Sequence, residues 1–141
     1  MKKFLLLSAC AAFFAATAFA QPSKVTIPVS KTPANNGQDM YVSYCAPCHG
    51  VDGRGGGPTA AALIHKPTDL TLLSKNNNGV YPATHVVSIL RFGVENAAHG
   101  SKLMPVWGPI LGRINHSQGS QNERTLRVAN LVNYIQTLQA K

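Results

Sequence analysis

Two cysteines and a histidine stand close together in the first third of the chain. Cys45 and Cys48 are three residues apart, and His49 follows at once. This spacing is the attachment signature of c-type haem. On one helical turn the two thiols can reach the two vinyl groups of a porphyrin and form thioethers, while His49 presents its imidazole to the iron. The motif predicts one covalently bound haem c, with Cys45 and Cys48 as its thioether residues and His49 as the proximal axial ligand.

Three other kinds of site also use closely spaced cysteines. A zinc site normally takes four ligands, and Cys10 is the only further cysteine in the chain. A thioredoxin-like site would suit Pro47 between the cysteines but needs a βαβ context, and the flanking sequence is poor in β-branched runs. A disulfide that closes so short a loop constrains the unfolded chain little. Haem attachment is favoured, and thiol redox chemistry at Cys45 and Cys48 stays as the alternative.

The first twenty residues have the composition of a secretory leader. Lys2 and Lys3 precede an apolar run, and small residues flank Phe19 at its end. This pattern predicts a signal peptide over residues 1–20, cleaved after Ala20, and a periplasmic or otherwise exported protein. A lipoprotein-like box ends at Cys10, but the apolar run continues well beyond it, so a lipid anchor at Cys10 is not favoured. We expect no membrane span after cleavage.

The mature chain is basic. Without Lys2 and Lys3 it keeps 11 of the 13 Lys and Arg residues against 5 Asp and Glu. These charges are scattered and are not interleaved with aromatic residues, so nucleic-acid binding has little support. A basic surface would instead steer encounters with a redox protein that has an acidic docking surface.

The rest of the sequence predicts one mostly helical domain with long loops. Residues 21–36 contain three prolines and read as an extended arm, which leaves residues 37–141 as the domain. Asn35 or Asn36 can cap a first helix, Gly93 can end a middle one, and Ser120 with Glu123 forms a capping box for the last. The expected helices span Gly37–Cys48, Pro82–Phe92 and Ser120–Leu138.

A glycine-rich loop follows the cysteine motif. After Gly50 come four more glycines up to and including Gly57, and no phosphate-binding lysine follows them. Residues without Cβ allow a backbone to pass close to another group. We expect this loop to wrap the edge of the haem. Short helical pieces are expected over Thr59–Ile64 and after Pro67, with a turn over Asn76–Gly79.

A haem bound through His49 needs a group on its opposite face, and that group decides what the iron can do. Met104 precedes Pro105 in a segment without helical periodicity, where a methionine is less expected as core filler, and we take it as the distal axial ligand. His99 is the nearest alternative. Weaker alternatives are His65, His85 and His116. Met40 lies on the attachment helix itself and cannot easily reach the opposite face.

Several of these residues together resemble the class I cytochromes c, the His/Met monohaem family, in its bacterial exported form. The resemblance covers nearly the whole mature domain, from Gly37 to Leu138. It is carried by the haem motif with Gly50, by Gly37 and Tyr41, by Gly57-Pro58, by the run from Met104 to Gly108, and by Leu131 with Tyr134. The early position of the motif does not fit the four-helix c′ type.

This resemblance implies an all-α cytochrome c fold in which the first and last helices cross. Gly37 would be the crossing point, with Tyr41 against Tyr134. The carbonyl of Pro58 would accept the Nδ1 proton of His49. Trp107 and Arg91 would lie near the haem propionates.

The function expected from these features is that of a periplasmic one-electron carrier. With both axial positions filled, neither oxygen nor a substrate coordinates the iron, and thioether ligation raises its potential relative to His/His. A tightly docked haem subunit of an exported dehydrogenase or oxidase complex is the alternative. No carboxylate pair, nucleophile–base pair or nucleotide fingerprint is found in the remaining residues, so we expect an electron carrier and not an enzyme.

Overall fold

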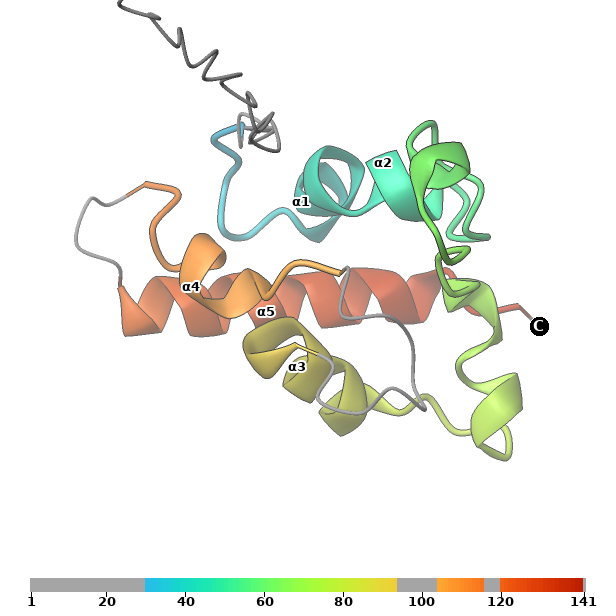
Figure 1. Ribbon diagram of the computed structural model, residues 1–141. Helices are drawn as coiled ribbons and strands as arrows, with labels where there is room; N and C mark the ends of the chain where they lie inside the picture. Colours follow the sequence, from blue (N-terminus) through green and yellow to red (C-terminus); the bar gives the residue numbers. More distant parts are fainter. Residues whose placement is uncertain (1–29, 94–103, 116–119, 141) are drawn as a thin grey trace, which may run out of the picture.

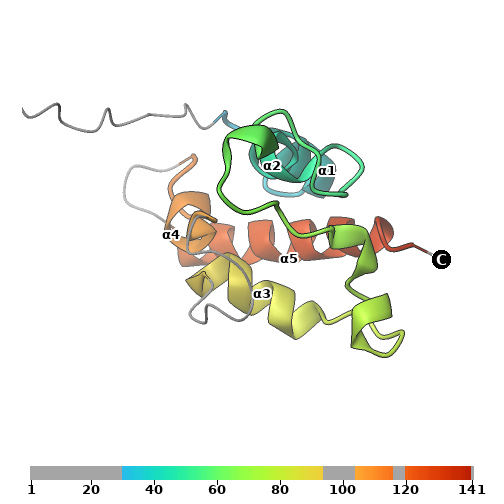
Figure 2. The same cartoon turned by 45° about the vertical axis from the view of Figure 1, so that its right-hand side comes forward.

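The computed structural model describes residues 30–93, 104–115 and 120–140, and within them it is helical, without strands. The all-α fold class is therefore confirmed. The longest helix, α5 (Gln121–Thr137), runs across the whole molecule (Figure 1). Helix α1 (Gly37–Tyr44) packs on one side of α5 and α3 (Ala83–Phe92) on the other, and Figure 2 shows the same arrangement after a turn. In this part of the chain no helix is long and apolar enough to cross a membrane.

The core lies where α5 meets the other helices. The apolar residues that recur at helical spacing along α5 are buried, and they pack against buried residues of α1, α3 and α4 (Trp107–Leu111). Each helix thus hides one face and leaves the other to solvent. The buried core side chains from these helices are Met40, Tyr41, Tyr44, Val86, Leu90, Leu111, Val128, Leu131, Val132 and Ile135.

The predicted N-cap residues of the first and last helices are confirmed, but the reciprocal bond of the capping box is not, because the Ser120 N–H donates to the carbonyl of Gly112 at 2.8 Å. Asn36 caps α1, with its side-chain oxygen accepting the backbone N–H of Asp39 at 3.0 Å. Ser120 caps α5 by accepting the N–H of Glu123 at 3.2 Å. Both bonds satisfy donors that a helix cannot satisfy internally, and both depend only on residues three apart.

The prediction of one helix from Gly37 to Cys48 is wrong. The chain forms α1 and then a separate turn, α2 (Ala46–His49), with Cys45 between them. Pro47 is the physical reason, because it has no N–H to donate to Ser43 and its ring would clash with that carbonyl. At the start of a new helix, where an N–H has no partner, Pro47 is tolerated.

The crossing of α1 and α5 is as predicted. A Cβ added to Gly37 would overlap the carbonyl oxygen of Asn130 and lie 2.9 Å from the Cβ of Tyr134. Next to this contact the rings of Tyr41 and Tyr134 are 5.2 Å apart between centroids. Gly37 is therefore required by the close approach of two helices.

A Gly37→Ala substitution is expected to lower the free energy of unfolding by about 1–3 kcal/mol, because the methyl group would force the helices apart. Urea denaturation measures this. Gly56→Ala is the matched control, since a Cβ there meets nothing within 4 Å, and it should change stability by less than about 0.5 kcal/mol. Equal stability of the two variants would contradict the crossing.

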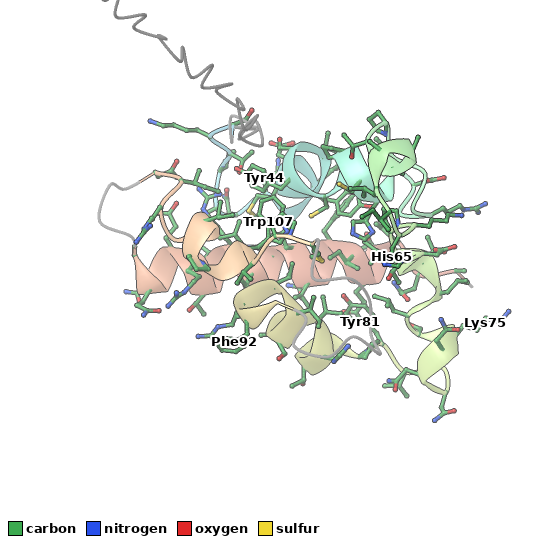
Figure 3. The ribbon with its side chains drawn as sticks, viewed as in Figure 1. Tyr44, His65, Lys75, Tyr81, Phe92 and Trp107 are labelled. Atoms are coloured by element: carbon green, nitrogen blue, oxygen red, sulfur yellow. The ribbon has the colours of Figure 1, made fainter. Side chains whose placement is uncertain are left out.

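Helix α4 is not foreseen by the sequence, which suggested a segment without helix. It is five residues long and contains Gly108 and Pro109, so it has neither periodicity nor propensity. Contacts with other helices therefore explain why this segment is helical. Gly108 lies directly against the backbone carbonyl of Arg91 at the end of α3, and Trp107 stacks on Tyr44 of α1, 5.7 Å between ring centroids (Figure 3).

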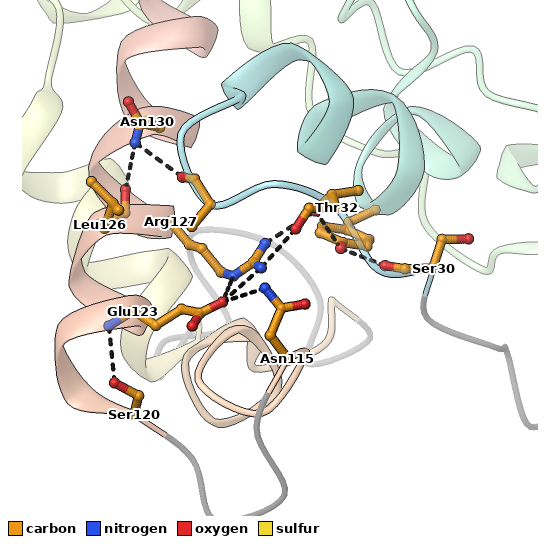
Figure 4. Close-up of polar contacts among 10 residues, drawn as sticks. Ser30, Thr32, Asn115, Ser120, Glu123, Leu126, Arg127 and Asn130 are labelled. Atoms are coloured by element: carbon orange, nitrogen blue, oxygen red, sulfur yellow. Dashed lines mark hydrogen bonds and ion pairs between the residues drawn. The ribbon is translucent and has the colours of Figure 1, made fainter.

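The described end of the arm, residues 30–36, is tied to the helices by a buried charge network (Figure 4). Arg127 of α5 is fully buried and donates to the carbonyl of Thr32 at 2.7 Å and to its hydroxyl at 3.0 Å. The same guanidinium forms a 2.8 Å ion pair with Glu123. Tyr44 donates to the carbonyl of Ser30 at 2.6 Å. Arg127 is therefore a basic residue that does not contribute to the basic surface.

Candidate functional site

Cys45 caps the end of α1, and Cys48 and His49 follow it on the single turn of α2, so the three residues of the motif lie close together. Cys45 is buried in the core, with 6 % of its surface exposed, whereas Cys48 and His49 are half-buried. The two cysteines are free thiols. The motif thus has one sulfur in the protein interior and a second sulfur and an imidazole nearer its boundary.

The environment of Cys45 does not suit thiol redox chemistry. Burial, and secondarily the neighbouring Cys48, raises the pKa of the Cys45 thiol to about 12. A redox nucleophile needs the opposite, a lowered pKa in a partly exposed, electropositive position. Cys45 instead resembles an inert buried thiol at neutral pH.

Thr59 holds the second cysteine, a contact that the sequence did not suggest. Its hydroxyl donates to the carbonyl of Pro47 at 2.6 Å and lies 3.1 Å from the Sγ of Cys48. The backbone N–H of Thr59 donates to the same carbonyl at 2.9 Å. The loop after the motif therefore returns to α2 and orients its side chains.

The imidazole of His49 is oriented by a backbone carbonyl, but not by the expected one. Its Nδ1 lies 3.0 Å from the carbonyl oxygen of Thr68, so the prediction that Pro58 accepts this proton is wrong. Burial lowers the pKa of His49, while the hydrogen bond to Thr68 works in the opposite direction. A neutral ring with its proton on Nδ1 leaves Nε2 as the nitrogen that can bind a metal.

The path of the glycine-rich loop explains why the carbonyl of Thr68, and not that of Pro58, lies next to His49. Gly57 packs directly on the carbonyl oxygens of Ala46 and Pro47, and Gly55 packs on the carbonyl of Pro67. These two glycines therefore approach the chain's own backbone, where a haem edge was expected. The contact of Gly55 brings the segment around Pro67 up to the motif, and with it Thr68.

The residues expected on the side of the haem opposite His49, or beside its propionates, come from α3, α4 and the segment before α4. Met104 is half-buried and packs against the hydrophobic core, as does Trp107. Arg91 is half-buried, its guanidinium lies 5.3 Å from the ring centroid of Phe92, and its carbonyl meets Gly108 next to Trp107. The structure thus places the backbone of Arg91 against Gly108, the neighbour of Trp107, and it leaves the distal role of Met104 as a prediction.

The structure also places the alternative histidine ligands and Met40. Met40 is fully buried in the core of α1, and His65 and His85 are exposed. His99 and His116 lie outside the described residues. Within the described part of the chain no three His, Cys, Asp or Glu side chains form a group that could hold a metal ion. A His/Met iron centre would not form such a group, because it takes one histidine and a thioether from the protein.

The chain was compared with known proteins. No family model matches it, and no curated protein matches it. It is similar to a solved chain of a reducing HAO-like protein complex of Kuenenia stuttgartiensis, with 22 % identity, a TM-score of 0.44, and coverage of 79 % of this chain and 45 % of that chain. The chain therefore spans less than half the length of that relative. Similarity at this level assigns no family, so we infer the chemistry of the site from its own geometry.

Proposed function

We propose that this protein is an exported monohaem c-type cytochrome that carries single electrons between redox proteins. The observation that carries the proposal is the turn α2. This turn and Cys45, the residue that precedes it, hold two free thiols and a neutral histidine, and the Nδ1 of that histidine already has a carbonyl partner. These are the groups that covalent haem attachment and one axial iron bond require.

The donor set fits a haem in its chemistry. Cys45 and Cys48 supply two thiols for the thioethers, and the free Nε2 of His49 supplies the proximal nitrogen. Met104 would supply the distal sulfur, and Trp107 with Arg91 would lie beside the propionates. When bound, the haem supplies a reversible one-electron couple. The protein then sets its potential through the axial ligands, their hydrogen bonds and burial.

Signal peptide cleavage after Ala20 and a periplasmic location are part of this proposal. The leader pattern supports export, and covalent haem attachment needs the two cysteines as free thiols presented outside the cytoplasm. The net positive charge of the mature chain supports a partner with an acidic docking surface.

Expression of the full chain with haem-maturation machinery tests the proposal. The purified protein is expected to give a pyridine haemochrome spectrum of covalent haem, at one haem per chain, and a mass without residues 1–20. A Cys45→Ser/Cys48→Ser double variant should hold no covalent haem, because neither thioether can form. The control is Cys10→Ser, which removes a cysteine from the leader and should change neither haem content nor release from membranes. A wild-type protein without covalent haem would overturn the proposal.

Carbon monoxide separates an electron carrier from a gas-binding or enzymatic haem protein. With Met104 on the iron, the reduced protein should bind carbon monoxide poorly, because the sixth position is filled. Ready binding by the wild-type protein would contradict the carrier function and leave the covalent haem intact.

A further inference from the structure

We propose that Gln139, just after the end of α5, is a positioning residue for His49. The inference rests on the proposed haem function, and it concerns how the far end of the chain sets the orientation of the proximal ligand. The structure links the two residues through one segment, residues 68–74, which carries the carbonyl that receives the Nδ1 proton of His49.

The side-chain amide of Gln139 makes two hydrogen bonds to this segment, which we call the Gln139 clasp. Its Oε1 accepts the backbone N–H of Ser74 at 2.8 Å, and its Nε2 donates to the carbonyl of Leu70 at 2.8 Å. The same Nε2 also donates to Ile135 of α5 at 3.0 Å, which fixes the amide to the helix. A single half-buried side chain thus joins the last turn of α5 to both ends of residues 70–74.

Further hydrogen bonds hold the part of this segment that connects the Gln139 clasp to the carbonyl of Thr68. Asp69 accepts the backbone N–H of Thr71 at 2.9 Å and its hydroxyl at 2.6 Å. Leu70 donates its N–H to the carbonyl of Gly53 at 2.7 Å. Thr68, exposed itself, stands next to Asp69, so its carbonyl is held in place mainly by these neighbours. Movement of residue 70 would be passed on to the Thr68 carbonyl.

This carbonyl matters because of its effect on the imidazole. A hydrogen bond from Nδ1–H to an oxygen acceptor raises the basicity of the other ring nitrogen, the one that binds the metal. A more basic ligand favours the ferric state over the ferrous state. Loosening of the Thr68 carbonyl is therefore expected to raise the reduction potential. Gly53 and Ala140, which donates to Thr71 at 2.9 Å, would still hold the segment near its place.

The test compares Gln139→Ala with Gln136→Ala in the haem-loaded full-length protein. Gln136 is exposed and lies three residues earlier on α5, so its substitution should leave the potential unchanged. Gln139→Ala should shift the reduction equilibrium about two- to fivefold toward the ferrous form. This effect is smaller than the roughly 10-fold or larger effects expected when the hydrogen-bond partner of a metal ligand is removed outright, because here the Thr68 carbonyl is only loosened. That shift is about 20–40 mV, at 59 mV per tenfold. The His49 Nδ1 proton, followed by NMR in the reduced protein, should exchange faster in the same variant.

A structural role alone would lower the stability of the Gln139 variant and leave the potential and the proton exchange unchanged, and that result would overturn the inference. Gln139→Met keeps the volume of the side chain but makes neither clasp bond, and it serves if the alanine variant does not fold. A wild-type protein without haem would refute the proposed function alone. The inference would then be judged in the haem-free protein by the ¹⁵N shift of His49 Nδ1, which Gln139→Met should change and Gln136→Ala should not.

Discussion

Substitution of Met104 by alanine is expected to remove the sulfur-to-iron absorption band of the oxidised protein. It should also lower the reduction potential on the order of 100 mV, because axial ligands set haem potentials over a range of about 0.8 V. Thioether sulfur stabilises the electron-rich ferrous iron, and its loss withdraws that stabilisation. The same variant should bind carbon monoxide once reduced, because the distal position is open. Optical spectra and a redox titration of the purified variant measure all three effects.

Met40→Leu is the matched control for this experiment. Met40 is fully buried on α1, and leucine fills a similar volume, so this variant should keep the band and the potential. A Met104→Ala protein that keeps its band would exclude Met104 as the ligand. A histidine ligand gives no sulfur-to-iron band. Loss of this band in a His99 variant would therefore not identify His99 as the ligand, and it would not support Met104 either.

Substitution of Arg127 by alanine is expected to cost about 3–5 kcal/mol of unfolding free energy. The guanidinium is fully buried and bonds Thr32 twice and Glu123 at 2.8 Å. Its removal takes away a charge partner of the Glu123 carboxylate, which is only 13 % exposed. It also frees the arm around Thr32 from α5. Thermal and denaturant unfolding of haem-loaded protein measure the loss.

Two further variants make this prediction specific. Arg113→Ala removes an exposed arginine and should change stability by less than about 0.5 kcal/mol. In an Arg127→Met/Glu123→Gln double variant no uncompensated charge is buried, so part of the stability should return. A double variant less stable than Arg127→Ala would show that the cost is not electrostatic. Equal stability of Arg127→Ala and wild type would contradict the buried network itself.

Much of the helical framework could be predicted because its signals are local. The caps at Asn36 and Ser120 depend on residues three positions away, and the buried stripe of α5 follows from its 3.6-residue period. The crossing glycine, Gly37, could be recognised from a family pattern. The spacing of Cys45, Cys48 and His49 is likewise a property of consecutive residues, and it is what predicts the haem.

The tertiary structure alone decided which distant groups meet. Every residue has a carbonyl, so sequence cannot tell that Thr68 and not Pro58 receives the His49 proton; packing of Gly55 on Pro67 decides it. A charged residue reads as surface until its partners are known, and Arg127 finds Thr32 95 positions away. Helix α4 and the Gln139 clasp arise in the same way, from contacts between segments that are remote in sequence. The amino-acid sequence by itself thus predicts which chemistry the protein carries. The tertiary fold decided which backbone and side-chain groups lie around the motif, because local propensities act over a few residues and close packing acts across the whole chain.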